Sequence, residues 1–397
     1  IISADSAKQK AVIAQAAITA SKPLQSLFFR LNPEQQAAAV EGGLLEPDQC
    51  LALMGPAATG KSTVSTATIL IHLLVVEGAK VLVVGPTNHL LDGLAADLVG
   101  QGAAAVRFLS KKEKVKKQKS NAAVLPWTYE GIILQAARNG DPLCKRYFEI
   151  IRLEQTKKRR PQFAKEKRQI TQTLQRRVVQ KGQVIIVTPP IAVALAELFA
   201  LNPFSLTILE EGDLVALYVA CVIPVTRFVL NGDPFQLRAR HGTPALSWIS
   251  SVWGRLELRI QYRMEREIMR WSNELFYSKR LICGPLAAGV LPTICPRLGV
   301  MWSGKSSYYV SAGAAEKSAA IIKQLAKSKF ALSNVCVLTP YKNQLAAIEE
   351  AIKEIRDDYG ERADCCTIDS VQGREYLVII IVLPVLAKGV NAFSADW

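Results

Sequence analysis

A phosphate-binding pattern stands near the start of the chain. Residues 55–62 read Gly-Pro-Ala-Ala-Thr-Gly-Lys-Ser, which matches G-x-x-x-x-G-K-[ST]. An apolar run precedes the motif and a helical pattern over 61–77 follows it, which is the strand–loop–helix context that the motif requires. Backbone N–H groups of such a loop can surround a triphosphate. The residues expected to bind nucleotide are Gly55, Gly60, Lys61, Ser62 and Thr63, with Lys61 on the β- and γ-phosphates and Ser62 on Mg²⁺.

Acidic and polar residues follow other apolar runs. Glu210 and Glu211 come directly after the run 206–209, and a Gly-Asp-x-x-Gln pattern ending at Gln236 follows the run 228–230. Two carboxylates at the end of a strand are placed to hold Mg²⁺ and to activate water. Three more polar motifs come later: Gln261-Tyr262-Arg263-Met264, Thr339-Pro340-Tyr341-Lys342-x-Gln344 and Asp369-Ser370-x-Gln372-Gly373-x-Glu375.

The elements that must position these residues alternate between buried strands and helices. The expected strands are nearly continuous apolar runs, which are typical of parallel strands covered on both faces. They span residues 51–54, 81–85, 184–188, 206–209, 228–230, 335–339 and 377–383. This alternation predicts an α/β fold with ligand-binding loops at the carboxyl ends of the strands.

The charge of the chain is concentrated in one segment. The net charge is +15, and residues 104–181 hold 21 Lys and Arg against 6 Asp and Glu, so the remainder is neutral. We expect this segment to be a basic helical insertion that contacts nucleic-acid phosphates, through Lys111, Lys112, Lys116 and Lys117 above all. A merely solvated basic surface is the alternative.

Composition excludes several other classes of protein. No apolar run reaches the length of a membrane span without interruption. The eight cysteines form no C-x-x-C pair and there are only three histidines, which disfavours a zinc module. The expected location is therefore intracellular, with nucleus and cytoplasm not distinguished, and no membrane partner is expected.

Taken in order, these motifs resemble those of the superfamily 1 nucleic-acid helicases of the nonsense-mediated-decay and senataxin type. The resemblance runs from about Leu31 to Trp397, and Leu31-Asn32-Pro33-Glu34-Gln35 matches the adenine-reading glutamine motif of that family. It implies two RecA-like parallel-sheet P-loop domains, ATP and Mg²⁺ as cofactors, and single-stranded RNA or DNA as partner. The expected organisation is an N-terminal helix in 1–30, a first domain in 31–258 that carries the insertion 104–181, and a second domain in 259–397 that is truncated at its C-terminal end.

The resemblance also implies a role for each matching residue. Gln35 would read adenine with Tyr262 stacked nearby, and Glu375 would contact the nucleotide from the second domain. Lys61, Glu211, Gln236 and Arg263 would be catalytic: Glu211 would orient or deprotonate water, Gln236 would sense the γ-phosphate, and Arg263 would stabilise the transferring phosphoryl group. Ser62 and Glu210 would hold Mg²⁺. The residues expected to face nucleic acid are Thr87, Asn88, Thr188, Thr339, Ser370 and Gln372, although Thr87 and Thr188 could instead be caps at strand ends.

The chain departs from the family pattern at its active site. Glu210 stands where the family has aspartate, and Ala57 and Ala58 replace Pro-Gly in the loop. If position 58 has a positive φ, alanine there costs about 1 kcal/mol or more. A late family motif that supplies a further arginine is missing before Trp397. We therefore expect an ATP-dependent nucleic-acid helicase or translocase, with RNA favoured over DNA by the resemblance. The alternative is a catalytically weak or inactive helicase-like RNA-binding scaffold subunit of a larger ribonucleoprotein assembly.

Overall fold

The computed structural model describes residues 4–110, 126–155, 161–212, 226–236, 245–285, 310–353, 355, 360–371 and 374–383. Gln372 and the four lysines at 111, 112, 116 and 117 lie outside the described residues. The chain divides into two compact units. The first comprises Ile1–Arg263 and Phe276–Gly284, and the second comprises Met264–Leu275 and Pro285–Trp397. The domain limits expected from the sequence stay a prediction.

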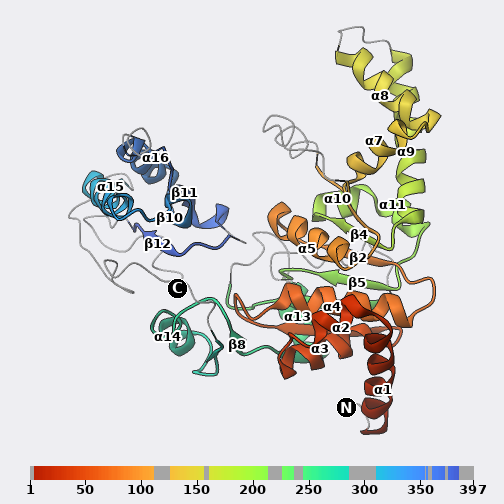
Figure 1. Cartoon of the computed structure of the whole chain (residues 1–397), viewed down its shortest axis with the longest axis horizontal. Coiled ribbons are helices and arrows are strands. Elements are labelled where there is room, and N and C mark those ends of the chain that lie inside the picture. Colours follow the sequence, from red (N-terminus) through yellow and green to blue (C-terminus); the bar gives the residue numbers. More distant parts are fainter. Residues whose placement is uncertain are drawn as a thin grey trace. The chain divides into compact units, whose positions relative to one another are not determined.

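A parallel sheet of seven strands forms the centre of the first unit (Figure 1). The strand order is β3-β4-β2-β5-β6-β1-β7, and every adjacent pair is parallel. Because the strands are parallel, all of their carboxyl ends lie at one edge of the sheet. The strands are β1 (Gln49–Met54), β2 (Val81–Val84), β3 (Ala105–Arg107), β4 (Val184–Val187), β5 (Leu206–Leu209), β6 (Arg227–Gly232) and β7 (Gly254–Glu257).

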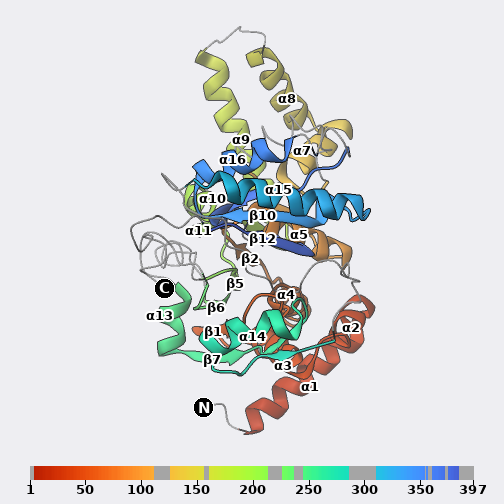
Figure 2. The same ribbon diagram turned by 90° about the vertical axis from the view of Figure 1, so that its left-hand side faces the viewer.

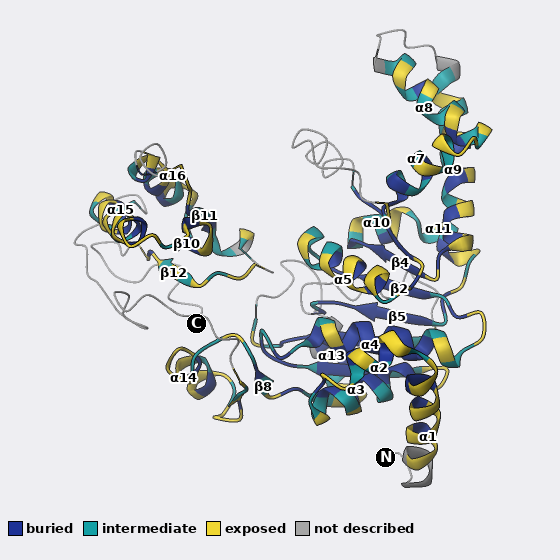
Figure 3. Cartoon of the chain, viewed as in Figure 1, coloured by how far each residue is buried: buried dark blue, intermediate teal, exposed yellow. Residues whose placement is uncertain are grey.

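Alternate residues of each strand point to opposite faces of this sheet, and both faces are buried (Figure 3). In β2, Val81 and Val83 pack into one core, whereas Leu82 and Val84 pack into the other. The first core is completed by α1 (Ala4–Ala20), α2 (Lys22–Phe28), α3 (Pro33–Gly43), α4 (Lys61–Val75) and α5 (Asn88–Gly100). Burial on both faces explains why the strands read as continuous apolar runs.

The second face is covered by the helices of the basic segment together with three shorter helices. The segment first adds β3 to the edge of the sheet and then forms α7 (Tyr129–Arg138), α8 (Pro142–Gln155) and α9 (Pro161–Lys181). Helices α8 and α9 lie side by side and extend away from the sheet (Figure 2). Ile170, Leu174 and Val178 form the buried stripe of α9. The shorter helices are α10 (Pro189–Ala194), α11 (Ala196–Ala200) and α13 (Ala245–Val252).

The second unit contains a smaller parallel sheet in the order β11-β10-β12. Its strands are β10 (Val335–Thr339), β11 (Asp364–Thr367) and β12 (Val378–Ile381). One face packs against α15 (Ala312–Lys327) and α16 (Lys342–Ala351) through Ile322, Leu325 and Ile348. Helix α14 (Arg266–Leu275) also belongs to this unit.

A short two-stranded ladder lies in the first unit. Strand β8 (Ile260–Gln261) pairs in parallel with β9 (Ile282–Cys283). The described architecture confirms the prediction of an α/β fold built on parallel sheets of the RecA-like P-loop type. Within the described ranges, no helix combines the length and apolar character that crossing a bilayer requires.

Candidate nucleotide-binding site

The phosphate-binding loop connects β1 to α4 with a tightly packed backbone. Gly60 precedes the first residue of α4 and has a φ of 81°, in the left-handed region that favours glycine. A Cβ at Gly60 would lie 2.4 Å from Nε2 of Gln35, and one at Gly55 would lie 2.5 Å from Oγ1 of Thr59. A side chain at either position would therefore displace Gln35 or Thr59, and at Gly60 the backbone conformation also favours glycine.

Ala58 also has a positive φ, of 64°. A left-handed backbone brings the Cβ of an L-residue too close to the following carbonyl oxygen, at a cost of about 1–2 kcal/mol. Ala58 therefore has the positive φ that makes alanine costly at this position. The loop retains this conformation without a glycine at position 58.

The side chain of Lys61 lies against the loop that precedes it. Its Nζ donates to the carbonyl oxygens of Gly55 at 2.6 Å and Pro56 at 3.1 Å, and the residue is only 8% exposed. Ser62 and Thr63 follow in the first turn of α4, half-buried and exposed respectively. The loop therefore presents an ammonium and the N-terminus of a helix together, which is the electrostatic requirement for binding phosphate.

Glu210 follows β5 and is almost fully buried, at 1% exposed. The hydroxyl of Ser65 in α4 donates to its Oε1, and Nδ2 of Asn231 in β6 donates to the same oxygen at 3.1 Å. Burial raises the pKa of Glu210 above its ordinary value, while the two donors oppose the shift. Its neighbour Glu211 is half-buried and has a φ of 50°.

Ser65 and Asn231 were not among the residues assigned a role from the sequence. Asn231 also donates to Oγ of Ser65 at 2.5 Å, so the two residues and Glu210 form one buried cluster. A signal for Asn231 was present, because it ends an apolar run just as Glu210 does. Ser65 gave no such signal, since it lies one turn beyond the motif.

Gln35 links α3 to the phosphate-binding loop. Its backbone N–H donates to Oδ1 of Asn32 at 2.9 Å, and its Oε1 accepts from the Asn32 backbone N–H at 2.9 Å, which together make a capping box. Its Nε2 donates to the carbonyl of Thr59 at 2.9 Å. Asn32 in turn donates to the hydroxyl of Tyr262 at 2.7 Å. The backbone N–H of Tyr262 also donates to the carbonyl of Ala58 in the loop at 3.0 Å. The structure thus brings both Gln35 and Tyr262 to the phosphate-binding loop.

Gln236 is held by the acidic residue of its own motif. Its Nε2 donates to Oδ2 of Asp233 at 3.0 Å, and Asp233 is buried just beyond the end of β6. Arg263 is exposed and is the last residue of the first unit before α14. Glu375 is exposed and belongs to the second unit. The catalytic and nucleotide roles of these residues stay predictions.

Two of the residues expected to face nucleic acid have intramolecular roles at the end of β2. Oγ1 of Thr87 accepts from the backbone N–H of Leu90 at 3.4 Å and so caps α5. Oδ1 of Asn88 accepts from the guanidinium of Arg107 at 2.6 Å. Arg107 is fully buried and also donates to Asp92 at 3.3 Å.

The remaining residues expected to face nucleic acid lie at other strand ends. Thr188 is buried at the start of α10. Thr339 is buried at the end of β10, and among the described residues its Oγ1 has no hydrogen-bond partner. Ser370 is exposed, and its hydroxyl closes a turn with Thr367. Contact of these residues with nucleic acid stays a prediction.

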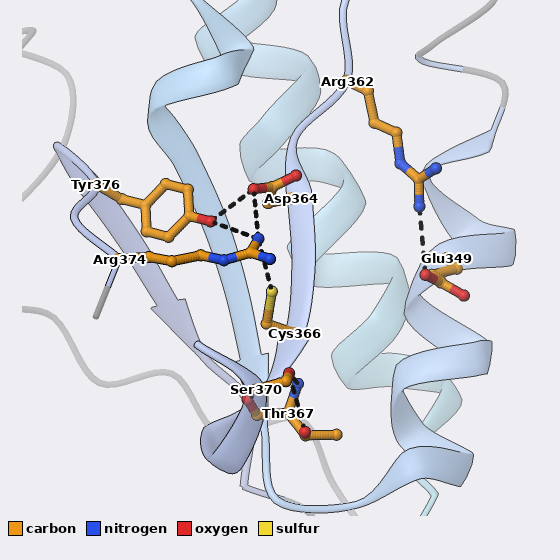
Figure 4. A network of polar contacts seen from close by, with 8 residues as sticks. All are labelled: Glu349, Arg362, Asp364, Cys366, Thr367, Ser370, Arg374 and Tyr376. Atoms are coloured by element: carbon orange, nitrogen blue, oxygen red, sulfur yellow. Dashed lines mark hydrogen bonds and ion pairs between the residues drawn. The ribbon is translucent and has the colours of Figure 1, made fainter. Parts of the chain in front are cut away.

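Arg374, which lies between Ser370 and Glu375 in the sequence, contacts residues of β11 and its neighbour Tyr376 (Figure 4). Its guanidinium donates to Oδ2 of Asp364 at 3.3 Å and to the hydroxyl of Tyr376 at 3.4 Å. Tyr376 donates to the same Asp364 oxygen at 2.5 Å. Burial is the main cause that raises the pKa of Tyr376, to about 12, so it stays a donor at neutral pH. These contacts join Arg374 and Tyr376 to β11 through side chains that the motif pattern did not single out.

The fold and the loop define the class of the protein: a P-loop protein of RecA-like architecture. Residues 251–385 match a family model described as an AAA domain. A regulator of nonsense transcripts 1 homolog from Arabidopsis thaliana is 27% identical over 87% of this chain and 29% of its own length. The ATP-dependent helicase NAM7 of Saccharomyces cerevisiae is 25% identical over 89% of this chain and 38% of its own length.

In sequence the chain is similar to superfamily 1 helicases of the nonsense-mediated-decay and senataxin type. It spans about a third of the length of these curated relatives. Among solved structures, an arterivirus nonstructural protein 10 helicase matches with a TM-score of 0.41 and 15% identity, covering 90% of this chain and 57% of the other. The similarity to helicases rests on the sequence relatives.

Proposed function

We propose that the chain hydrolyses ATP and uses the hydrolysis to move along single-stranded nucleic acid. The observation that carries the proposal is the loop itself, where buried Lys61 lies on the carbonyls of Gly55 and Pro56 at the N-terminus of α4. Parallel pairing brings the ends of β1, β5 and β6 to the same edge, so Glu210 and Gln236 lie on neighbouring strand ends. The names of the relatives support ATP as the nucleotide.

The residues present fit a triphosphate with Mg²⁺. Gly55 and Gly60 add no side chain of their own to the loop, and the loop ends at the N-terminus of α4, where backbone N–H groups can bind phosphate. The hydroxyl of Ser62 and the carboxylate of Glu210 are oxygen donors of the kind that Mg²⁺ prefers. A bound Mg²⁺ would supply positive charge at the phosphate oxygens. Burial disfavours the charged form of Glu210, so its carboxylate needs a nearby cation to be fully ionised.

The other polar side chains of the site have distinct proposed tasks. Glu211 orients or deprotonates the attacking water. Gln236 contacts the γ-phosphate with the amide that Asp233 holds. Arg263 and Glu375, which follow β7 in the sequence, act on the nucleotide. An arginine positioned in this way raises the rate of hydrolysis roughly 10³–10⁵-fold. Gln35 and Tyr262 contact the base. To do so, the Gln35 side chain replaces one of its present hydrogen bonds, to Asn32 or to Thr59, by one to the base.

RNA is the strand we propose, in a ribonucleoprotein assembly, because two relatives are named regulators of nonsense transcripts. Another relative is named a DNA-binding protein, so DNA is the comparison strand in any test. The basic face of α9 supports a backbone-phosphate contact that does not depend on sequence. Lys165, Arg168 and Arg176 are exposed along this helix at spacings of three and eight residues.

The test is phosphate release from ATP with Mg²⁺, measured without nucleic acid, with single-stranded RNA and with single-stranded DNA. We expect turnover that RNA stimulates and that Lys61→Ala abolishes. Lys22→Ala, which removes an exposed lysine at the start of α2, is the matched control and should leave turnover unchanged. Absence of turnover with RNA binding intact would contradict the proposal and favour a nucleic-acid-binding scaffold.

A further inference from the structure

The segment Phe276–Gly284 follows α14 but belongs to the first unit. Tyr277, its second residue, points its hydroxyl at the site and donates to Oδ2 of Asp233 at 2.6 Å. The two residues are 44 positions apart in the sequence. The chain therefore passes through the second unit at α14 and then returns to the motif that carries Gln236.

The carboxylate of Asp233 accepts hydrogen bonds from three other residues. Its Oδ2 accepts from Tyr277 and from Nε2 of Gln236, and its Oδ1 accepts from the backbone N–H of Phe235 at 3.1 Å. An ionised carboxylate only accepts hydrogen bonds, so it fixes the NH₂ end of the Gln236 amide toward itself. The second N–H of that amide is then the one that can reach a phosphate oxygen.

Tyr277 is itself held in place. Its ring packs edge-on against Phe235 with centroids 5.3 Å apart, and Arg280 donates from its backbone to the carbonyl of Tyr277 at 3.0 Å. The next two residues, Ser278 and Lys279, have φ values of 52° and 62°. Two consecutive non-glycine residues in the left-handed region are strained and persist only where surrounding contacts impose them.

We propose that Tyr277 is a positioning residue for Gln236, acting through Asp233 to fix the amide that senses the γ-phosphate. The proposal rests on the proposed ATP hydrolysis and deepens it. Burial, and next to it the charge of Asp233, raise the pKa of Tyr277, so the hydroxyl keeps its proton and its role as donor throughout the neutral pH range. Without that donor, Asp233 can rotate and the direction of the Gln236 amide is no longer fixed.

The test is a double-mutant cycle with Tyr277→Phe, Gln236→Ala and both together. A hydrogen bond to a charged group implies that Tyr277→Phe lowers kcat roughly tenfold. We expect KM for ATP to stay the same, and the preference for a non-hydrolysable ATP analogue over ADP to fall by a similar factor. In the Gln236→Ala background Tyr277→Phe should have no further effect, because the group through which it acts is gone.

Tyr147→Phe, at a half-buried tyrosine of α8, is the matched control and should change none of these quantities. Losses that multiply in the double variant, or an unchanged kcat and nucleotide preference in folded Tyr277→Phe, would overturn the inference. If Tyr277→Phe does not fold, Asp233→Asn takes its place in the same cycle, since it preserves volume but permits the amide to be reversed. A wild-type chain that binds nucleotide without turnover contradicts only the proposed hydrolysis, because the nucleotide preference still measures the inference. A chain that binds no nucleotide contradicts both.

Discussion

Ser65 of α4 donates its hydroxyl hydrogen bond to the buried carboxylate of Glu210, 145 residues further along the chain. Glu210 is one methylene longer than the aspartate of the helicase motif that this part of the sequence resembles. Two donors, Ser65 and Asn231, hold the longer side chain through its Oε1. This cluster decides how charge and stability depend on pH at the site.

Replacing Glu210 by glutamine should make stability less dependent on pH. Burial raises the pKa of the carboxyl above 4.5, so from that pH up to the raised pKa the folded chain retains a proton that the unfolded chain releases. Stability therefore falls as pH rises through this window. Glu210→Gln stays neutral and keeps an oxygen for Ser65 and Asn231. We expect a higher Tm at neutral pH, measured by thermal unfolding from pH 4 to pH 8, together with loss of ATP turnover.

The control for this substitution is Glu197→Gln, which neutralises an exposed glutamate of α11. It should leave the slope of Tm against pH as it is in the wild type. A Glu210→Gln chain with the wild-type slope would show that the pKa of Glu210 is the same in the folded and unfolded chain.

Glycine at position 58 should stabilise the loop. Ala58 has a φ of 64°, and relief of that strain outweighs the greater freedom of glycine in the unfolded chain. We expect Ala58→Gly to raise the free energy of unfolding by about 0.5–1 kcal/mol and to tighten ATP binding. The neighbouring Ala57 has no positive φ, so Ala57→Gly should instead lower the free energy of unfolding by about 0.4–1 kcal/mol. Equal signs for the two substitutions in urea unfolding would contradict the argument.

Asn88 should prove to be a structural residue. Its Oδ1 accepts from the fully buried Arg107 guanidinium at 2.6 Å, so Asn88→Ala removes one partner of a buried charge. We expect a loss of about 1–3 kcal/mol in the free energy of unfolding. His89→Ala, at an exposed neighbour, should change it by less than about 0.5 kcal/mol. Weaker nucleic-acid binding by Asn88→Ala without loss of stability would instead favour a direct contact with the strand.

The exposed basic face of α9 should determine the salt dependence of nucleic-acid binding. Replacing Lys165, Arg168 and Arg176 by glutamine should reduce the slope of log K against log salt by about 0.7 for each lost single-strand phosphate contact. The matched control replaces Lys323, Lys327 and Lys329, exposed residues at the end of α15 and just after it, by glutamine. The net charge changes equally in both. Identical slopes in the two variants would show that only overall charge matters.

The sequence was sufficient to predict the elements with the strongest patterns. Strands buried on both faces have no alternative to a continuous apolar run, and all seven expected runs overlap strands of the two sheets. Short or polar strands were missed for the same reason. Strand β3 is only Ala-Val-Arg, and β11 is Asp-Cys-Cys-Thr, so neither has an apolar pattern of its own. Each is recognisable only when it pairs with β4 or β10. The expectation of cover on both faces was wrong for β12, where Ile379 and Ile381 are exposed.

The chemistry of the loop was determined locally, because Gly60, Lys61 and Ser62 are adjacent in the chain and a strand–loop–helix unit places them together. The supporting contacts were decided only by the tertiary structure. Ser65 reaches Glu210, Asn88 reaches Arg107, and Tyr277 reaches Asp233 because parallel pairing and the return of the chain after α14 bring distant segments to one sheet edge. A motif specifies which atoms can react, whereas the partners that fix and desolvate those atoms follow from packing over long separations.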